Sequence, residues 1–128
     1  MLVSVRGLYA IETKTYSKPR KGEVKAVFDG DRILVDGFEP ERNAVRQVRY
    51  LSKWLQDLLA ETTGRRFPVR GVVLLPGWYV EKTPKNSEVW VLNEKALPSF
   101  IDNEPVVLTE EDVALISSRI THHSSRIA

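Results

Sequence analysis

The segment that most constrains the fold is a short run from Val69 to Leu75 that is almost continuously apolar and ends at Pro76 and Gly77. It does not alternate between apolar and polar residues as a half-exposed strand does, so it predicts a strand buried on both faces. Because both faces of such a strand need cover, we expect a layered α/β domain with this strand inside its sheet. No apolar stretch of the chain approaches the roughly 18–20 residues that span a bilayer, so no membrane association is expected.

The segments on either side of this run predict the other layers. Apolar residues recur at three- and four-residue steps from Pro40 to Thr62, which predicts an amphipathic helix that Gly64 ends. Asp29-Gly30 lies between two β-prone runs and is a typical hairpin turn. The other expected elements are a hairpin over 3–16 that turns at Arg6-Gly7, strands over 24–28, 32–35 and 88–92, a short helix over 96–102 and a last helix beginning at Thr109. Residues 121–128 are expected to form a polar, frayed tail after a single domain over 1–120.

Composition narrows the possible function classes. The chain of 128 residues has no cysteine, which excludes a disulfide framework, a thiolate zinc site and a cysteine nucleophile, and which favours a cytoplasmic location. Residues 1–70 hold 14 Lys and Arg against 9 Asp and Glu, whereas residues 71–128 hold 5 against 8. A basic first part favours an anionic partner, of which nucleic acid is the commonest.

The most specific local feature is Ile11-Glu12-Thr13-Lys14. Residues two apart on a strand share a face, so Glu12 and Lys14 should project together. A carboxylate can hold a hard divalent cation, and a neighbouring ammonium can orient an attacking water or neutralise charge on a phosphate. The alternative is an ordinary exposed ion pair on a solvated strand.

A row of cations follows the predicted helix. Arg42, Arg46, Arg49 and Lys53 are spaced four, three and four residues apart, which places them on one stripe. Like charges at this spacing repel one another, so the stripe favours a nucleic-acid partner contacted at its phosphates. Lys18, Arg20 and Lys21 of the preceding loop add to this interpretation. The alternative is a solvated helix surface.

Gln47 lies on a neighbouring stripe of the same helix, with Tyr50 and Trp54 three and seven residues later. It is either a support for a metal or phosphate near Lys14 or a half-exposed flank residue. Trp78 and Tyr79 follow the turn at Pro76-Gly77, where they are core or edge residues or a surface on which bases stack.

The order of these features resembles the nuclease-related domain (NERD) family of the PD-(D/E)xK nuclease superfamily. The resemblance is carried by Gly7 to Tyr16 with its Ile-Glu-x-Lys strand end, by Arg42 to Leu51 with Asn43 and Gln47, and by Val69 to Leu75. Ala44 stands where the family usually has proline. The resemblance implies a restriction-endonuclease-like mixed sheet flanked by helices, with an inserted β-hairpin.

The same resemblance implies a chemistry, which is Mg²⁺- or Mn²⁺-dependent hydrolysis of DNA phosphodiester bonds. Glu12 and the backbone carbonyl of Thr13 would hold the metal, Lys14 would position the water and Gln47 would support it. The family carries a further metal-binding Asp about a dozen residues before this Glu, and no acidic residue precedes Glu12 here. We therefore expect a domain that lacks the family's N-terminal helix and first catalytic strand, with impaired catalysis.

Three alternatives follow from that departure. The chain is an impaired nuclease, or a non-catalytic nucleic-acid-binding or accessory domain that uses the basic stripe, or part of an ordinary nuclease whose upstream segment carries the Asp. A strand near residues 2–5 without its neighbour also offers unpaired backbone groups, which predicts a homodimer through that edge.

Overall fold

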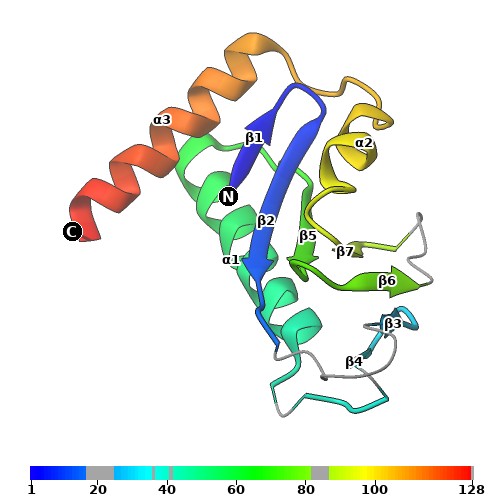
Figure 1. Ribbon diagram of the computed structural model, residues 1–128. Coiled ribbons are helices and arrows are strands. Elements are labelled where there is room, and N and C mark those ends of the chain that lie inside the picture. The colour runs from blue at the N-terminus through cyan, green and yellow to red at the C-terminus, as the bar shows by residue number, and fades with distance from the viewer. Residues whose placement is uncertain (17–24, 36, 41, 82–86, 128) are drawn as a thin grey trace.

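The computed structural model describes residues 1–16, 25–35, 37–40, 42–81 and 87–127, and arranges them as a mixed sheet with helices on both faces (Figure 1). The predicted α/β class is therefore confirmed. In chain order the described elements are β1 (Leu2–Ser4), β2 (Gly7–Thr13), β3 (Lys25–Phe28), β4 (Ile33–Val35), α1 (Ala44–Thr63), β5 (Val69–Leu74), β6 (Tyr79–Glu81), β7 (Val89–Leu92), α2 (Leu97–Asp102) and α3 (Glu110–Ile127).

The apolar run forms β5 in the interior of the main sheet. The described strands of this sheet have the order β1-β2-β5-β7, with β1 antiparallel to β2 and the other pairs parallel. Val72 and Val73 point to opposite faces, and both are fully buried. The prediction of a strand covered on both sides is therefore confirmed.

The predicted hairpin at Asp29-Gly30 forms, but it belongs to a second sheet. Its strands β3 and β4 are antiparallel, and β3 pairs in parallel with β6. The sequence analysis did not predict β6, because three residues are too few for alternation to be read. Phe28 and Ile33 pack with Trp78 in the same buried cluster, so the hairpin is anchored to the core.

Helix α1 covers one face of the main sheet. It begins at Ala44 rather than at Pro40, because the side chain of Asn43 accepts a hydrogen bond from the Arg46 N–H at 3.1 Å and caps the helix. Gly64 ends it in the left-handed conformation at φ 75°, as predicted. The opposite face of the sheet packs against α2 through Phe100 and neighbouring residues.

Close approach of α1 to the sheet depends on Gly71. A Cβ at this position would lie 2.8 Å from Cγ1 of Val48 and 3.2 Å from Oγ of Ser52. Val48 and Ser52 are both buried, so neither can move aside without disturbing the interface. Glycine is therefore required here by packing.

The C-terminal helix is longer than the sequence predicts. The segment from Thr121 that we expected to fray belongs to α3 as far as Ile127. Trp54 of α1 contacts the ring of His123 edge-on at a centroid distance of 5.2 Å, so contact with α1 continues beyond the apolar residues that defined the expected helix. None of the helices in the described parts of the chain is both long and apolar enough to cross a bilayer.

Candidate functional site

Glu12 near the end of β2 and Lys14, the residue just after it, project on the sheet face that α1 covers. Ala10 packs in one buried cluster with Val45 and Val48 of α1, and alternate strand residues share a face. Nζ of Lys14 lies 3.3 Å from Oε1 of Glu12, and the two side chains are 23% and 35% exposed. The structure thus brings together the two residues that the strand alternation places on one face.

This pair lies at the carboxyl end of β2, beside the first turns of α1. Glu12 is opposite Val73 of β5, and the N–H of Lys14 donates to the Leu74 carbonyl at 3.0 Å. Val73 packs in the same buried cluster as Ala44, the first residue of α1. The carboxyl ends of parallel strands are the usual ligand-binding edge of an open α/β sheet.

Gln47 lies in the first turns of α1, and its side-chain carbonyl is buried. Its Oε1 atom accepts no hydrogen bond from the described residues. Trp54, seven residues later on the same side of the helix, contacts His123 of α3, and α3 packs beside β1. Gln47 is therefore on the flank of α1 that faces β1 and β2. A buried acceptor without a hydrogen-bond donor is rare. This oxygen is therefore available to coordinate a cation or to accept a hydrogen bond from a ligand.

The candidate metal ligands are oxygen atoms, which suit a hard cation, but they are few. The Glu12 carboxylate, the Gln47 amide oxygen and the backbone carbonyl of Thr13 are all oxygen donors, which Mg²⁺ and Mn²⁺ prefer. Lys14 pairs with Glu12 in this arrangement. Within the described segments, no group of three or more His, Asp or Glu side chains could hold a metal ion.

Asp29, one of the acids that follow Glu12 in the sequence, is occupied in the β3–β4 turn. Oδ1 of Asp29 accepts the N–H groups of Arg32 at 2.7 Å and Asp31 at 2.9 Å. These bonds, the Arg32 N–H first, lower the pKa of Asp29 below its ordinary value. Asp29 therefore has the role typical of the Asp in an Asp-Gly turn, while Asp36 lies outside the described residues.

The basic stripe on α1 divides into free and paired cations. Arg49 has Nε 2.7 Å from Oε1 of Glu88 and Nη1 3.4 Å from Oδ1 of Asp31, and it also donates to the Gly30 carbonyl. It therefore joins α1 to the β3–β4 turn and to the residue before β7. The sequence analysis missed these pairs, because both acids come from elements distant in the chain.

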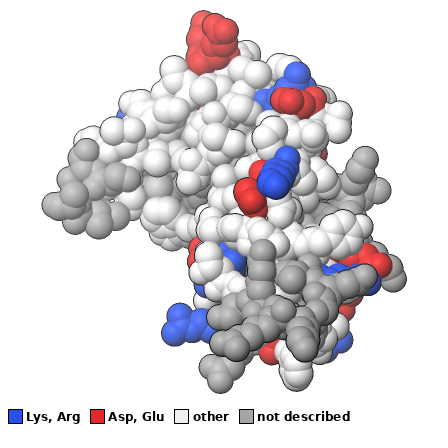
Figure 2. Space-filling view, in the orientation of Figure 1, with Lys and Arg blue, Asp and Glu red and all other residues white. Residues whose placement is uncertain are grey.

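The other cations of the stripe point to solvent. Arg42, Arg46 and Lys53 are exposed and form no ion pair with the described residues. The predicted stripe of four cations is shorter than expected, because α1 begins at Ala44 after the cap Asn43 and Arg42 therefore precedes the helix. Lys18, Arg20 and Lys21, which we also predicted to bind nucleic acid, lie outside the described residues. On the face shown in Figure 2, basic and acidic side chains lie next to one another in small groups without a broad field of one sign.

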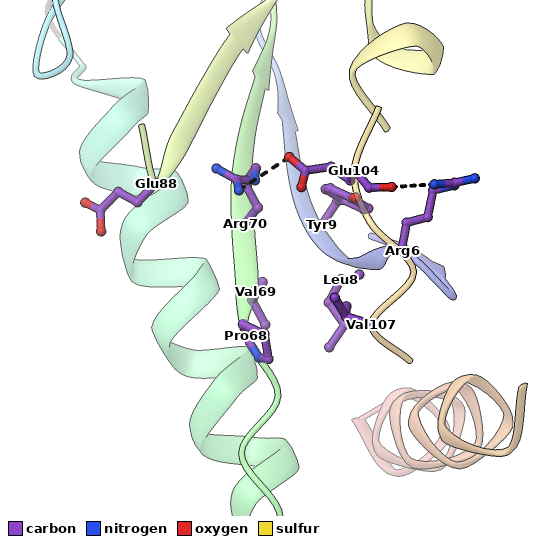
Figure 3. A pocket seen from close by; sticks show the side chains of 10 residues that line it. Arg6, Leu8, Tyr9, Pro68, Val69, Arg70, Glu88, Glu104 and Val107 are labelled. Carbon is purple, nitrogen blue, oxygen red and sulfur yellow. Dashed lines mark hydrogen bonds and ion pairs between the residues drawn. The ribbon is translucent and has the colours of Figure 1, made fainter. Parts of the chain in front are cut away.

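A second polar cluster lies at the other end of the main sheet, around a cavity of about 300 Å³ (Figure 3). Arg70 lies 3.6 Å from the Glu104 carboxylate, donates to the Ser87 carbonyl and stacks over the Trp90 ring at 4.4 Å. Arg6 donates to the backbone carbonyl of Glu104. These contacts tie the loop after α2 to the sheet, and no sequence signal links residues so far apart.

Tyr9 lines the same cavity beneath Gly7. Burial raises the pKa of its phenol above the ordinary value, and the nearby Glu104 carboxylate adds to the increase. The phenol oxygen would lie 3.5 Å from a Cβ at position 7. Since Arg70 is paired with the Glu104 carboxylate and Arg6 donates to the Glu104 backbone carbonyl, we assign the cluster a structural role.

Comparison with known proteins identifies the family. The family model of the nuclease-related domain matches residues 1–76, more than half of the chain, and this span contains Glu12, Lys14 and Gln47. No curated protein and no solved structure matches. The matched span runs from β1 through β5, so β6, β7, α2 and α3 lie beyond it. The chain therefore belongs to the nuclease-related domain family.

Proposed function

We propose that the chain is a metal-dependent nuclease domain acting on DNA phosphodiester bonds, with its site at Glu12 and Lys14. The observation that carries this proposal is the 3.3 Å pair on the α1-covered face, at the carboxyl end of a parallel strand and inside the family match. An exposed pair on the outer face of an edge strand would not support it. This pair instead lies on the face covered by α1, the helix whose first turns carry Gln47 with its buried, unpartnered oxygen.

Each residue of the proposed site has a role that follows from its chemistry. Glu12 and the Thr13 carbonyl would hold Mg²⁺ or Mn²⁺, and Gln47 would support the ion or a phosphate oxygen. When bound, the cation supplies Lewis-acid polarisation of the phosphate. Lys14 orients the attacking water and neutralises charge that develops on the phosphate during displacement.

We also propose that full activity needs a second carboxylate beside Glu12. Among the residues proposed for the site, Glu12 supplies the one carboxylate. An acid supplied from an upstream segment or from a partner would complete the site, and reading the upstream DNA for an in-frame Asp tests that source.

A second candidate function is favoured by the exposed cations on α1 and just before it. Arg42, Arg46 and Lys53 are exposed without ion pairs among the described residues, as a surface that contacts phosphates would be. In this alternative the domain binds nucleic acid without cleaving it, and the Glu12–Lys14 pair is a relic. Reversing the charge of Arg46 would then weaken binding, whereas Lys14→Ala would have little effect.

Two further proposals concern the oligomeric state of the protein and its cellular location. We propose a homodimer through β1, which lies at an edge of the main sheet among the described strands and can pair there with a second copy. A cytoplasmic location remains a prediction from composition.

Cleavage assays test the nuclease proposal. Supercoiled and linear DNA are incubated with the full chain in Mg²⁺ or Mn²⁺, beside Lys14→Ala and a matched control, Lys95→Ala, which changes an exposed lysine beyond the family match. We expect slow, metal-dependent cleavage that Lys14→Ala abolishes and Lys95→Ala retains. Cleavage that Lys14→Ala leaves unchanged would remove the assignment.

A further inference from the structure

Two large aromatic side chains lie on the solvent side of α1. Tyr50 is 72% exposed and Trp54 is 49% exposed. No hydrogen bond or ring contact joins Tyr50 to the described residues, whereas one side of Trp54 packs against His123. Aromatic rings are usually buried because each carries a large apolar area, so a pair left in water points to a ligand.

The neighbours of Tyr50 on the helix surface define the chemistry of that ligand. Arg46 and Gln47 precede Tyr50 by four and three residues, and Lys53 and Trp54 follow it by three and four. Residues at these spacings are adjacent on a helix, so one side of the ring has two cations and the other has Trp54 and Gln47. None of these four neighbours is acidic. The first acidic residue of α1 is Asp57.

We propose that this face of α1 binds single-stranded DNA, with bases stacked on Tyr50 and Trp54 and phosphates held by Arg46 and Lys53. Cations beside aromatic rings are the usual combination for single strands, since an unpaired base presents its π-face and its backbone carries the charge. A duplex would engage the cations but leave the rings without a partner. Charge complementarity and ring exposure together favour the single strand.

The inference deepens the proposed function and rests on it. Gln47 belongs both to the neighbourhood of Tyr50 and to the candidate catalytic site, because its buried oxygen lies on the flank that faces β2. A strand stacked along Tyr50 and Trp54 would therefore continue toward Glu12 and Lys14. The substrate class is then single-stranded DNA or a frayed duplex end.

Intrinsic fluorescence gives a direct readout of binding. Trp78 and Trp90 are each 1% exposed, so a change caused by a stacked base reports on Trp54. The full chain is titrated in EDTA with an oligothymidylate and, separately, with a blunt-ended duplex. We expect quenching by the single strand, weaker quenching by the duplex, and a loss of affinity with added salt.

Substitutions separate stacking from charge. Tyr50→Ala should weaken single-strand binding about fivefold or more, as the loss of one base–aromatic stack does. Tyr50→Phe, which keeps the ring, should retain binding. Phe38→Ala is the matched control, because Phe38 is 76% exposed but lies after β4 and outside α1. Arg46→Gln should reduce the salt slope by about one.

Three results would overturn the proposal. The first is an unchanged affinity of both Tyr50→Ala and Trp54→Leu for a dye-labelled oligothymidylate, measured by fluorescence anisotropy because Trp54→Leu removes the intrinsic reporter. The second is equal affinity and quenching for duplex and single strand. The third is light scattering in which Tyr50→Ala dissociates a dimer that buries this face. Tyr50 is exposed on a helix and alanine is a good helix former, so unchanged melting confirms that the variant folds. If single-strand binding depends on Tyr50 but no cleavage occurs, the proposed function fails and the binding surface stands. If cleavage requires Lys14 but Tyr50→Ala binds single-stranded DNA as tightly as the wild type, the proposed function stands and the binding surface fails.

Discussion

Nζ of Lys14 lies 3.3 Å from Oε1 of Glu12 on a sheet face whose other described residues near α1 are apolar, with Ala10 and Val73 in the buried core. The presence of two charged side chains at the border of this apolar layer requires an explanation. As partly exposed groups they gain little stability from each other, because ion pairs of this kind contribute about 0–1 kcal/mol. Mutual stabilisation therefore does not explain the pair, and its position is consistent with the functional role proposed for it.

The first prediction follows from this weak stabilisation. Lys14→Ala should change the free energy of unfolding by no more than about 1 kcal/mol, measured by urea denaturation. Lys95→Ala, at an exposed position, provides the reference. A loss of more than about 3 kcal/mol would show instead that the pair is needed for folding, as for a buried ion pair.

The second prediction concerns the interface between α1 and β5. Gly71→Ala places a Cβ 2.8 Å from Cγ1 of Val48, so overpacking should destabilise the fold by about 1–3 kcal/mol. Val48→Ala removes the obstructing methyl groups. The double variant should therefore cost less than the sum of the two single variants in a thermal or urea unfolding series. Additive losses would mean that the helix does not approach the sheet at this point.

A third prediction is a pH dependence of stability at the start of α3. The side chain of Arg65, 2.7 Å away, and the Thr109 N–H lower the pKa of the Asp112 carboxyl below its ordinary value of 3.8. A lowered folded-state pKa stabilises the fold above the ordinary value, and the contribution is lost as pH falls through the folded-state value.

Asp112→Asn tests that sign. The variant should melt below the wild type at neutral pH, and the difference should shrink in acid as the wild-type carboxyl becomes protonated. Glu111→Gln, at an exposed neighbouring position, is the control. A difference in melting temperature that stays constant from pH 7 to pH 2 would contradict the assignment.

The fourth prediction concerns self-association through β1. If the edge of β1 pairs with a second copy, light scattering should show a dimer that grows with protein concentration. Leu2 is 38% exposed on this edge strand, and Leu2→Lys should shift the equilibrium to monomer because a charge on an edge discourages pairing. A strict monomer at high concentration would refute this prediction.

Sequence patterns predicted those parts of the fold that depend on interactions between residues close in the chain. The apolar steps of α1, the continuous apolar run of β5 and the alternation that pairs Glu12 with Lys14 each depend on residues close in the chain. The pairing of Arg49 with Glu88 and Asp31 could not be read in the same way, because Asp31 is 18 residues away and meets Arg49 only after folding. The length of α3 was missed for the same reason, since tertiary contact with Trp54 extends a polar segment.

The central claim is that Glu12 and Lys14 form a metal-assisted phosphodiester site, and Mn²⁺ titration of the full chain tests it most directly. Glu12→Gln should abolish specific Mn²⁺ binding. Lys14→Ala should strengthen Mn²⁺ binding several-fold, because a cation 3.3 Å from the ligand carboxylate is removed, while it eliminates DNA cleavage. Mn²⁺ affinity that is the same in the wild type, Glu12→Gln and Lys14→Ala would contradict the account.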